Sequence, residues 1–282
     1  GFDYEPKYRD WNGMRLAYID EGEGEPVFLL HGEPTWGFLW RKVMEPLLEA
    51  GYRCIVPDLP GFGRSDKPTD LSWYTFDRMA DSVATLVDEL GLEKATLVCH
   101  DWGGPIGLRV ATLERPEQFS RIVAMNTGLF TGYQRMSEDW LHFRDFIARH
   151  EDVRIAMPIQ GGAGSQLSDE VIAAYEAPFP TVPSKAGVRA FPPMIPMTPD
   201  APGAAEGQAT GAYLQTDARP MMLFWGDRDL ALPLDPVGRA VQNFFPNAAP
   251  LTVLEGGGHF VQEDQGEFIG EEIVKFIAAN PL

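Results

Sequence analysis

The sequence contains little cysteine and little positive charge. Its 282 residues include two cysteines, and 23 Lys and Arg residues stand against 41 Asp and Glu residues, which gives a formal net charge of −18. A surface this acidic repels the phosphates of nucleic acids and the headgroups of anionic lipids. We therefore expect neither a nucleic acid nor a membrane as a partner.

Long hydrophobic runs are missing as well. No stretch reaches the about 20 consecutive apolar residues that span a bilayer, and the first residues, Gly1-Phe2-Asp3-Tyr4, do not resemble a signal peptide. Cys54 and Cys99 lie in or beside apolar runs, which predicts buried free thiols rather than a disulfide. No Cys/His spacing is typical of a metal site. These observations predict a cytoplasmic protein without a metal.

The sequence does contain a regular alternation of strand and helix patterns. Short apolar runs typical of buried strands cover residues 26–31, 53–58, 95–99, 121–126, 221–225 and 251–254. Residues 76–90 carry apolar side chains at helical spacing before Gly91, and residues 268–279 indicate a closing helix. This alternation predicts an α/β fold with a mostly parallel sheet and helices on both faces.

The alternation is interrupted in the middle of the chain. Residues 129–154 have a helical and aromatic pattern, and eight prolines between residues 178 and 202 predict the absence of a regular helix there. The strand pattern resumes near residue 221. We therefore predict a core formed by residues 1–127 and 217–282, with a mainly helical lid inserted at residues 128–216.

Polar residues follow several of the predicted strands. Asp101 stands between a strand and a helix pattern that begins at Gly103-Gly104, a spacing typical of the nucleophile elbow, although Asp is also a common helix N-cap. A second carboxylate, Asp227 or Asp229, and then His259 follow later strands. Nucleophile, acid and histidine in this order are typical of α/β hydrolases, and the ends of parallel strands meet at one edge of the sheet.

An aspartate nucleophile indicates the class of substrate. A carboxylate attacks saturated carbon and forms an ester, which water activated by a histidine can hydrolyse. This chemistry suits alkyl halides or epoxides. An epoxide also needs an acid such as a tyrosine, whereas a halide needs only hydrogen-bond donors. The indole N–H of Trp102, next to Asp101, is such a donor, although the ring could also serve only as apolar bulk.

Several motifs resemble those of haloalkane dehalogenases, α/β hydrolases of which one subfamily has a glutamate in the oxyanion loop. The resemblance implies Asp101 as nucleophile, His259 as base and Asp229 as acid, since Asp229 stands three residues after Gly226. It also implies an oxyanion hole formed by the N–H groups of Glu33 and Trp102, a halide site at Trp102, and no cofactor. The motifs cover residues 31–36, 58–68, 101–104 and 258–263, and in the lid 177–180 and 186–192.

One feature departs from the family pattern. In the family, a segment early in the lid contains a second halide-binding tryptophan. The matching segment here, residues 143–146, has Phe143 in its place, and the nearest tryptophan is Trp140, three residues earlier. Either Trp140 replaces that tryptophan or the chain has one indole donor fewer. We further expect Trp36, Phe191 and Pro192 to line a pocket for a small apolar substrate, and the protein to be a monomer.

Two other functions stay open at this point. An epoxide hydrolase would use the same Asp-His-Asp residues, with tyrosines of the lid as proton donors. A non-catalytic, ligand-binding member of the fold is the other possibility, because a fold does not determine a function. The lid contains three tyrosines, namely Tyr133, Tyr175 and Tyr213.

Overall fold

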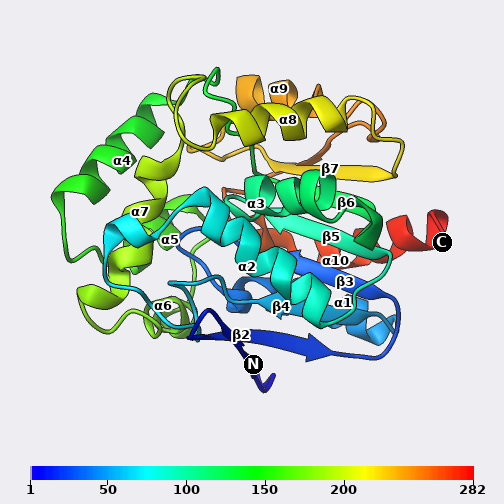
Figure 1. Cartoon of the computed structure of the whole chain (residues 1–282), viewed down its shortest axis with the longest axis horizontal. Helices are drawn as coiled ribbons and strands as arrows, with labels where there is room; N and C mark the ends of the chain where they lie inside the picture. The colour runs from blue at the N-terminus through cyan, green and yellow to red at the C-terminus, as the bar shows by residue number, and fades with distance from the viewer. Residues whose placement is uncertain (1) are drawn as a thin grey trace.

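The computed structural model describes residues 2–282 and contains an eight-stranded sheet between two layers of helices (Figure 1). The strand order is β1-β2-β4-β3-β5-β6-β7-β8. β2 pairs antiparallel with β1 and β4, and every other neighbouring pair is parallel. The predicted α/β class with a mostly parallel sheet is therefore confirmed.

The six predicted strands are present, and two more precede them. The additional strands β1 and β2 form a hairpin whose turn, Asn12-Gly13, has φ angles of 54° and 78°. Both values lie in the left-handed region, which an Asn-Gly pair adopts readily in a tight hairpin. The strands are β1 (Lys7–Trp11), β2 (Met14–Glu21), β3 (Pro26–Leu30), β4 (Arg53–Pro57), β5 (Ala95–His100), β6 (Phe119–Met125), β7 (Met221–Gly226) and β8 (Thr252–Leu254).

Helices cover both faces of this sheet. α2 (Phe76–Glu89), α3 (Gly103–Arg109) and α8 (Ala204–Leu214) lie in front of the strands in Figure 1, and α1 (Arg41–Glu49) packs with α10 (Val261–Ala279) behind them. The helix predicted at 76–90 is present as α2. Thr75 caps it, because its Oγ1 accepts a hydrogen bond from the N–H of Arg78 (3.2 Å). Elsewhere, α9 (Arg239–Gln242) follows β7.

The segment between β6 and β7 contains α4 (Glu138–Arg149), α5 (Ala156–Gly162), α6 (Asp169–Glu176) and α7 (Ala186–Met194), besides α8. α4–α7 gather at one end of the sheet, on the left in Figure 1. The helix predicted over 129–154 is shorter, because Ser137 starts α4 by accepting the N–H of Trp140 (3.1 Å).

The prediction of no regular helix in the proline-rich stretch is wrong for α7. Pro192 and Pro193 stand in the last turn of this helix, so the backbone N–H groups that they lack cost it only its final hydrogen bonds. The buried side chains of Val188 and Phe191 hold the helix against its neighbours. Local sequence pattern does not reveal the stabilisation that this packing supplies.

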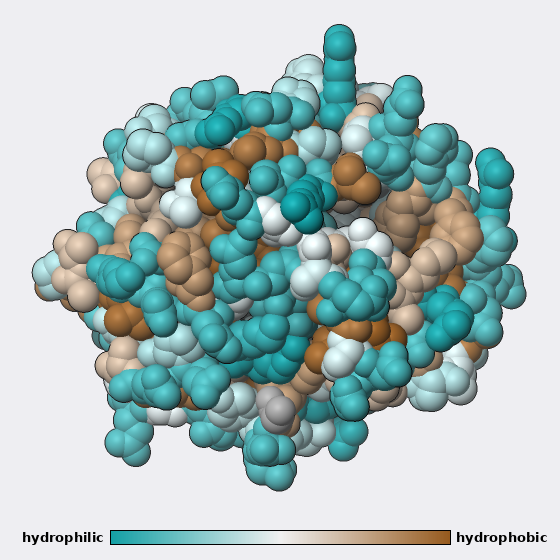
Figure 2. All heavy atoms as spheres, turned by 180° about the vertical axis from the view of Figure 1, so that it is seen from behind, coloured by the Kyte–Doolittle hydropathy of each residue, from teal (hydrophilic) through white to brown (hydrophobic). Residues whose placement is uncertain are grey.

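The cysteines lie in the core and polar side chains dominate the surface, as the composition predicts. Cys54 and Cys99 are free and buried as predicted, and burial raises the pKa of the Cys54 thiol to about 12. Within residues 2–282, no helix is both long and apolar enough to cross a bilayer. Polar side chains cover most of the face in Figure 2, where apolar ones form separate patches.

Candidate active site

A sharp turn after β5 exposes Asp101. Its φ of 49° lies in the left-handed region, and its carbonyl oxygen accepts a hydrogen bond from Thr127 Oγ1 (2.6 Å). A Cβ atom at Gly103 would lie 2.1 Å from the carbonyl oxygen of Leu30, and one at Gly104 would lie 1.8 Å from Thr127 Oγ1. The turn therefore requires both glycines and presents the carboxylate at the carboxyl edge of the sheet.

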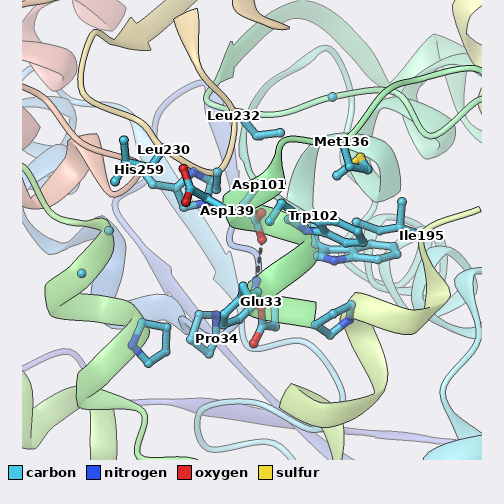
Figure 3. A pocket seen from close by; sticks show the side chains of 18 of the residues that line it. Glu33, Pro34, Asp101, Trp102, Met136, Asp139, Ile195, Leu230, Leu232 and His259 are labelled. Carbon is cyan, nitrogen blue, oxygen red and sulfur yellow. Dashed lines mark hydrogen bonds and ion pairs between the residues drawn. The ribbon is translucent and has the colours of Figure 1, made fainter. Parts of the chain in front are cut away.

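The two oxygens of the Asp101 carboxylate have different partners. Oδ1 accepts the backbone N–H of Glu33 (2.7 Å, dashed in Figure 3), and the backbone N–H of Trp102 also donates to this carboxylate. A Cβ atom at Gly32 would lie 2.2 Å from Oδ1, so only glycine allows this approach. Oδ2 lies 3.4 Å from Nε2 of His259. Oδ1 is thus held by the N–H of Glu33, while Oδ2 faces the histidine.

Asp229 is the carboxylate that contacts the histidine. Its Oδ2 lies 2.8 Å from His259 Nδ1, and its Oδ1 accepts the N–H groups of Ala231 (2.8 Å) and Leu232 (2.9 Å). Asp227 instead accepts the N–H of Gly256 (2.7 Å). The geometry therefore distinguishes the two candidate carboxylates and brings Asp101, His259 and Asp229 together.

The charges of this trio are coupled. Burial alone would lower the pKa of the His259 ring, but Asp229 and Asp101 outweigh that effect and raise the pKa to about 10. For Asp101, burial acts to raise the pKa, but the hydrogen bond and charge of His259 lower it overall. An imidazolium between two carboxylates is therefore the stable state near neutral pH.

Two polar residues at strand ends, neither of them among the predicted site residues, support the trio. Asn126 follows β6 with a φ of 38°, and its side-chain amide donates to Asp229 Oδ2 (2.8 Å). His100, the last residue of β5, is fully buried, and its Nε2 lies 2.8 Å from the carbonyl oxygen of His259. Burial, and secondarily the charge of His259, lowers the pKa of His100 to about 3. The signal that the sequence offers for both is a polar residue at the end of a buried strand.

A cavity of about 210 Å³ opens above Asp101. Most of its wall is apolar, and Trp102, Trp140 and Phe143 all contribute to it, as does the predicted Pro192. Its described lining residues are Glu33, Pro34, Asp101, Trp102, Gly128, Phe130, Met136, Asp139, Trp140, Phe143, Pro158, Gly161, Gly162, Pro192, Ile195, Leu230, Ala231, Leu232, His259 and Phe260.

Two residues predicted to line this pocket lie outside that set. Trp36 turns away, and its indole N–H donates to the carbonyl oxygen of Ala174 (3.2 Å). Phe191 is fully buried and packs between Phe62 and Trp102, with ring centroids 4.8 and 5.0 Å away. It therefore supports the Trp102 ring from behind. The prediction is wrong for both residues, because sequence position does not show which side of the wall they occupy.

The polar groups available in the cavity wall are few. For residues 2–282, neither the indole N–H of Trp102 nor that of Trp140 has a hydrogen-bond partner within the protein, and Phe143 has no donor to offer. The carboxyl group of Glu33 has a pKa raised well above its usual range, first by burial and then by the charge of Asp101. The wall therefore combines two free N–H donors with a carboxyl group that favours its neutral form.

Comparisons with known proteins agree with this geometry. Residues 25–152 match a family model described as the alpha/beta hydrolase fold. The haloalkane dehalogenase of Psychrobacter cryohalolentis is 39% identical, with 99% of this chain and 94% of the relative aligned. That of Mycobacterium marinum is also 39% identical, with 93% and 89% aligned.

A solved structure is similar over nearly the whole chain. It is described as the tetrameric structure of the haloalkane dehalogenase DpaA from Paraglaciecola agarilytica, and it has a TM-score of 0.91 and 32% identity, with 99% of this chain and 94% of that chain covered. Similarity in sequence and in structure therefore extends well beyond the motifs around Asp101. This chain belongs to the haloalkane dehalogenase family of α/β hydrolases.

Proposed function

We propose that this enzyme hydrolyses an alkyl halide to an alcohol, a halide ion and a proton, through an ester between the alkyl group and Asp101. The observation that carries the proposal is that the two oxygens of the Asp101 carboxylate have different partners. Oδ1 accepts the backbone N–H of Glu33, whereas Oδ2 faces His259. Oδ2 is therefore the oxygen free to attack.

In the first step, Asp101 Oδ2 displaces the halide from the substrate carbon. The new bond is an ester C–O bond, and the electron pair of the carbon–halogen bond leaves with the halide. The indole N–H groups of Trp102 and Trp140 meet the leaving anion in a largely apolar cavity, where hydrogen bonds to a charge are strong. We assign Trp140, rather than Phe143, as the second halide donor because only an indole supplies an N–H.

In the second step, water attacks the carbonyl carbon of the Asp101 ester. Esterification removes the negative charge of Asp101, which is one of the groups that raise the pKa of His259, so the imidazole can lose its proton and act as base. Oδ1, now the carbonyl oxygen, takes the negative charge within reach of the Glu33 and Trp102 N–H groups. Collapse of this intermediate releases the alcohol and regenerates the carboxylate.

The segment at 128–216 is proposed to act as a lid over a core of residues 1–127 and 217–282. Trp140, Phe143 and Pro192 belong to this segment and line the cavity, which supports a role in substrate selection. The apolar wall favours a small apolar substrate. A cytoplasmic location stays a prediction, as does the subfamily with Glu33 in the oxyanion loop.

Epoxide hydrolysis is the weaker candidate because it needs a tyrosine at the cavity. Tyr133 and Tyr213 are 72% and 38% exposed, and the hydroxyl of Tyr175 donates to Glu263 (2.5 Å). As far as residues 2–282 are concerned, none of the three lines the cavity above Asp101. The alternative therefore lacks a tyrosine as its proton donor.

The test is halide release from 1-bromobutane, 1,2-dibromoethane and their chlorinated counterparts, with Asp101→Asn measured in parallel. We expect release by the parent protein and its loss in the variant, because an amide oxygen is a poor nucleophile. If folded parent protein releases no halide from any of these substrates, the proposal is wrong and epoxides are the next class to test.

A further inference from the structure

A second cavity of about 320 Å³ lies beside the first. One side is formed by residues 128–137, which follow β6, and the other by residues 231–244, which follow β7. The two cavities share five lining residues, so only one layer of side chains separates them. The shared residues are Gly128, Phe130, Met136, Ala231 and Leu232.

One side of this shared wall is firmly held. The N–H of Leu232 donates to Asp229 Oδ1 (2.9 Å), and its carbonyl oxygen accepts the indole N–H of Trp225 (2.8 Å). Ser137 Oγ lies 3.2 Å from the carbonyl oxygen of Ala231 and ties the two segments together. The backbone of Leu232 is therefore fixed by the same carboxylate that orients the catalytic histidine.

The other side of the wall can adapt. Met136 is half-buried, and an unbranched thioether side chain with three rotatable bonds repacks easily. Figure 3 shows Met136 and Leu232 on the same side of the pocket, beyond Asp101 and Trp102. Among the five shared residues, Met136 therefore has the side chain with the most freedom to rotate.

The size of the first cavity limits what it can enclose. A cavity of about 150 Å³ accommodates benzene, which has six carbon atoms. By the same proportion, a cavity of 210 Å³ encloses about eight non-hydrogen atoms, or a halogen and about seven carbons. Longer chains must extend beyond it, either into solvent or into the second cavity.

We propose that the second cavity binds the far end of longer, unbranched alkyl chains, with Met136 as the movable part of the wall. The inference rests on the proposed function, since it extends the substrate site of that reaction. Apolar side chains, including Leu129, Val237, Val241 and Phe244, line the second cavity. It therefore suits a hydrocarbon tail, and each methylene that moves into it from water strengthens binding about fourfold.

The experiment fills the second cavity from its far side. Val237, which is half-buried, lines that cavity and not the first one, so Val237→Phe should occupy the space and leave the site at Asp101 unchanged. Arg239→Phe, on a nearby exposed position, adds the same bulk outside the cavity and is the matched control. Binding of heptan-1-ol, whose eight non-hydrogen atoms fit the first cavity, and of decan-1-ol, which extends beyond it, is measured by calorimetric titration, and 1-bromobutane turnover by halide release.

We expect the parent and Arg239→Phe to bind decan-1-ol at least about tenfold more tightly than heptan-1-ol. In Val237→Phe this preference should disappear, while heptan-1-ol binding and 1-bromobutane turnover stay within about twofold of the parent. Val241→Phe, which fills the cavity from another element, should act in the same way and replaces Val237→Phe if that variant does not fold.

An unchanged preference for decan-1-ol in both filled variants would overturn the inference and show that the chain leaves through the mouth of the first cavity. Failure of the proposed function has a different signature, because 1-bromobutane would then release no halide from the parent protein. The calorimetric comparison of the two alcohols still tests the second cavity in that case.

Discussion

At the scale of single residues, the proposed chemistry depends on the different partners of the two Asp101 carboxylate oxygens. Oδ1 accepts the backbone N–H of Glu33, so a donor of the proposed oxyanion hole is in position before substrate binds. Oδ2 lies 3.4 Å from Nε2 of His259. In the proposed mechanism, the same histidine is charged before substrate binds and acts as a base once Asp101 is esterified.

This arrangement predicts that His259→Gln accumulates the ester. The variant keeps Asp101 but lacks the base, so hydrolysis of the ester should slow by about 10²- to 10⁴-fold. Intact-protein mass spectrometry after incubation with 1-bromobutane should show the mass of one added butyl group. The double variant Asp101→Asn/His259→Gln is the control and should show no addition. An adduct in the double variant would assign the nucleophile to another residue.

The second halide donor gives a separate prediction. Trp140→Phe keeps an aromatic ring in the wall but removes the N–H, which should cost about 1.5–3 kcal/mol of halide stabilisation, or about 10- to 150-fold in kcat/KM. Phe143→Leu removes no donor and should change kcat/KM less than about threefold. Both constants are measured with 1,2-dibromoethane. The reverse order of effects would show that Phe143, and not Trp140, occupies the halide site.

The charge state of His259 also affects stability. Its folded pKa of about 10 exceeds the value of about 6.5 expected for an unfolded chain. The protonated ring therefore stabilises the fold fully below pH about 6.5, and this contribution is lost as the pH rises towards 10. We expect the difference in free energy of unfolding between the parent and His259→Gln to shrink between pH 6 and pH 10 in urea titrations. A constant difference would contradict the ion pair.

At the scale of elements, three helices meet at one buried carboxylate. Glu263 of α10 accepts two hydrogen bonds from the guanidinium of Arg41, at the start of α1 (2.5 and 2.6 Å). The hydroxyl of Tyr175 in α6 donates to the same carboxylate (2.5 Å). Because α6 belongs to the proposed lid, this contact joins the lid to two core helices close to His259.

The network predicts unequal costs for its members. Tyr175→Phe removes one hydrogen bond to a charged group and should lower the free energy of unfolding by about 1.5–3 kcal/mol. Glu263→Ala leaves Arg41 buried and unpaired, and should cost about 3–5 kcal/mol. Urea denaturation of both variants checks the order. A Tyr175→Phe variant as unstable as Glu263→Ala would mean that the hydroxyl, rather than the ion pair, holds the helices together.

At the scale of the whole molecule, charge and assembly are linked. The net charge of −18 opposes self-association, and separate rather than continuous apolar patches appear on the face in Figure 2. We predict a monomer at physiological salt, measured by light scattering during size-exclusion chromatography. The DpaA structure is described as tetrameric, so a mass of four chains is the outcome that would contradict this prediction.

Apolar periodicity in the sequence predicts the main strands and helices. Asp101 and His259 follow from periodicity and from polar residues at strand ends, because a parallel sheet brings those ends to one edge, whereas the choice of Asp229 over Asp227 comes from the resemblance to the family. The hairpin before residue 26 has a local signal, the Asn12-Gly13 pair, but its strands lie outside the apolar runs that predict the other six. Helix α7 does not follow from local pattern, because its prolines are unfavourable and packing with distant segments stabilises it.

Which side chains meet depends on how the elements pack together. Asn126 reaches Asp229 across 103 positions of sequence, and His100 reaches the backbone of His259 across 159. Trp36 and Phe191 lie outside the pocket although their residue types suit its wall. The second cavity likewise lies between two segments about 100 residues apart. A sequence pattern specifies which way a side chain points from its own element, whereas contacts and cavities depend on the distances between elements, which packing alone determines.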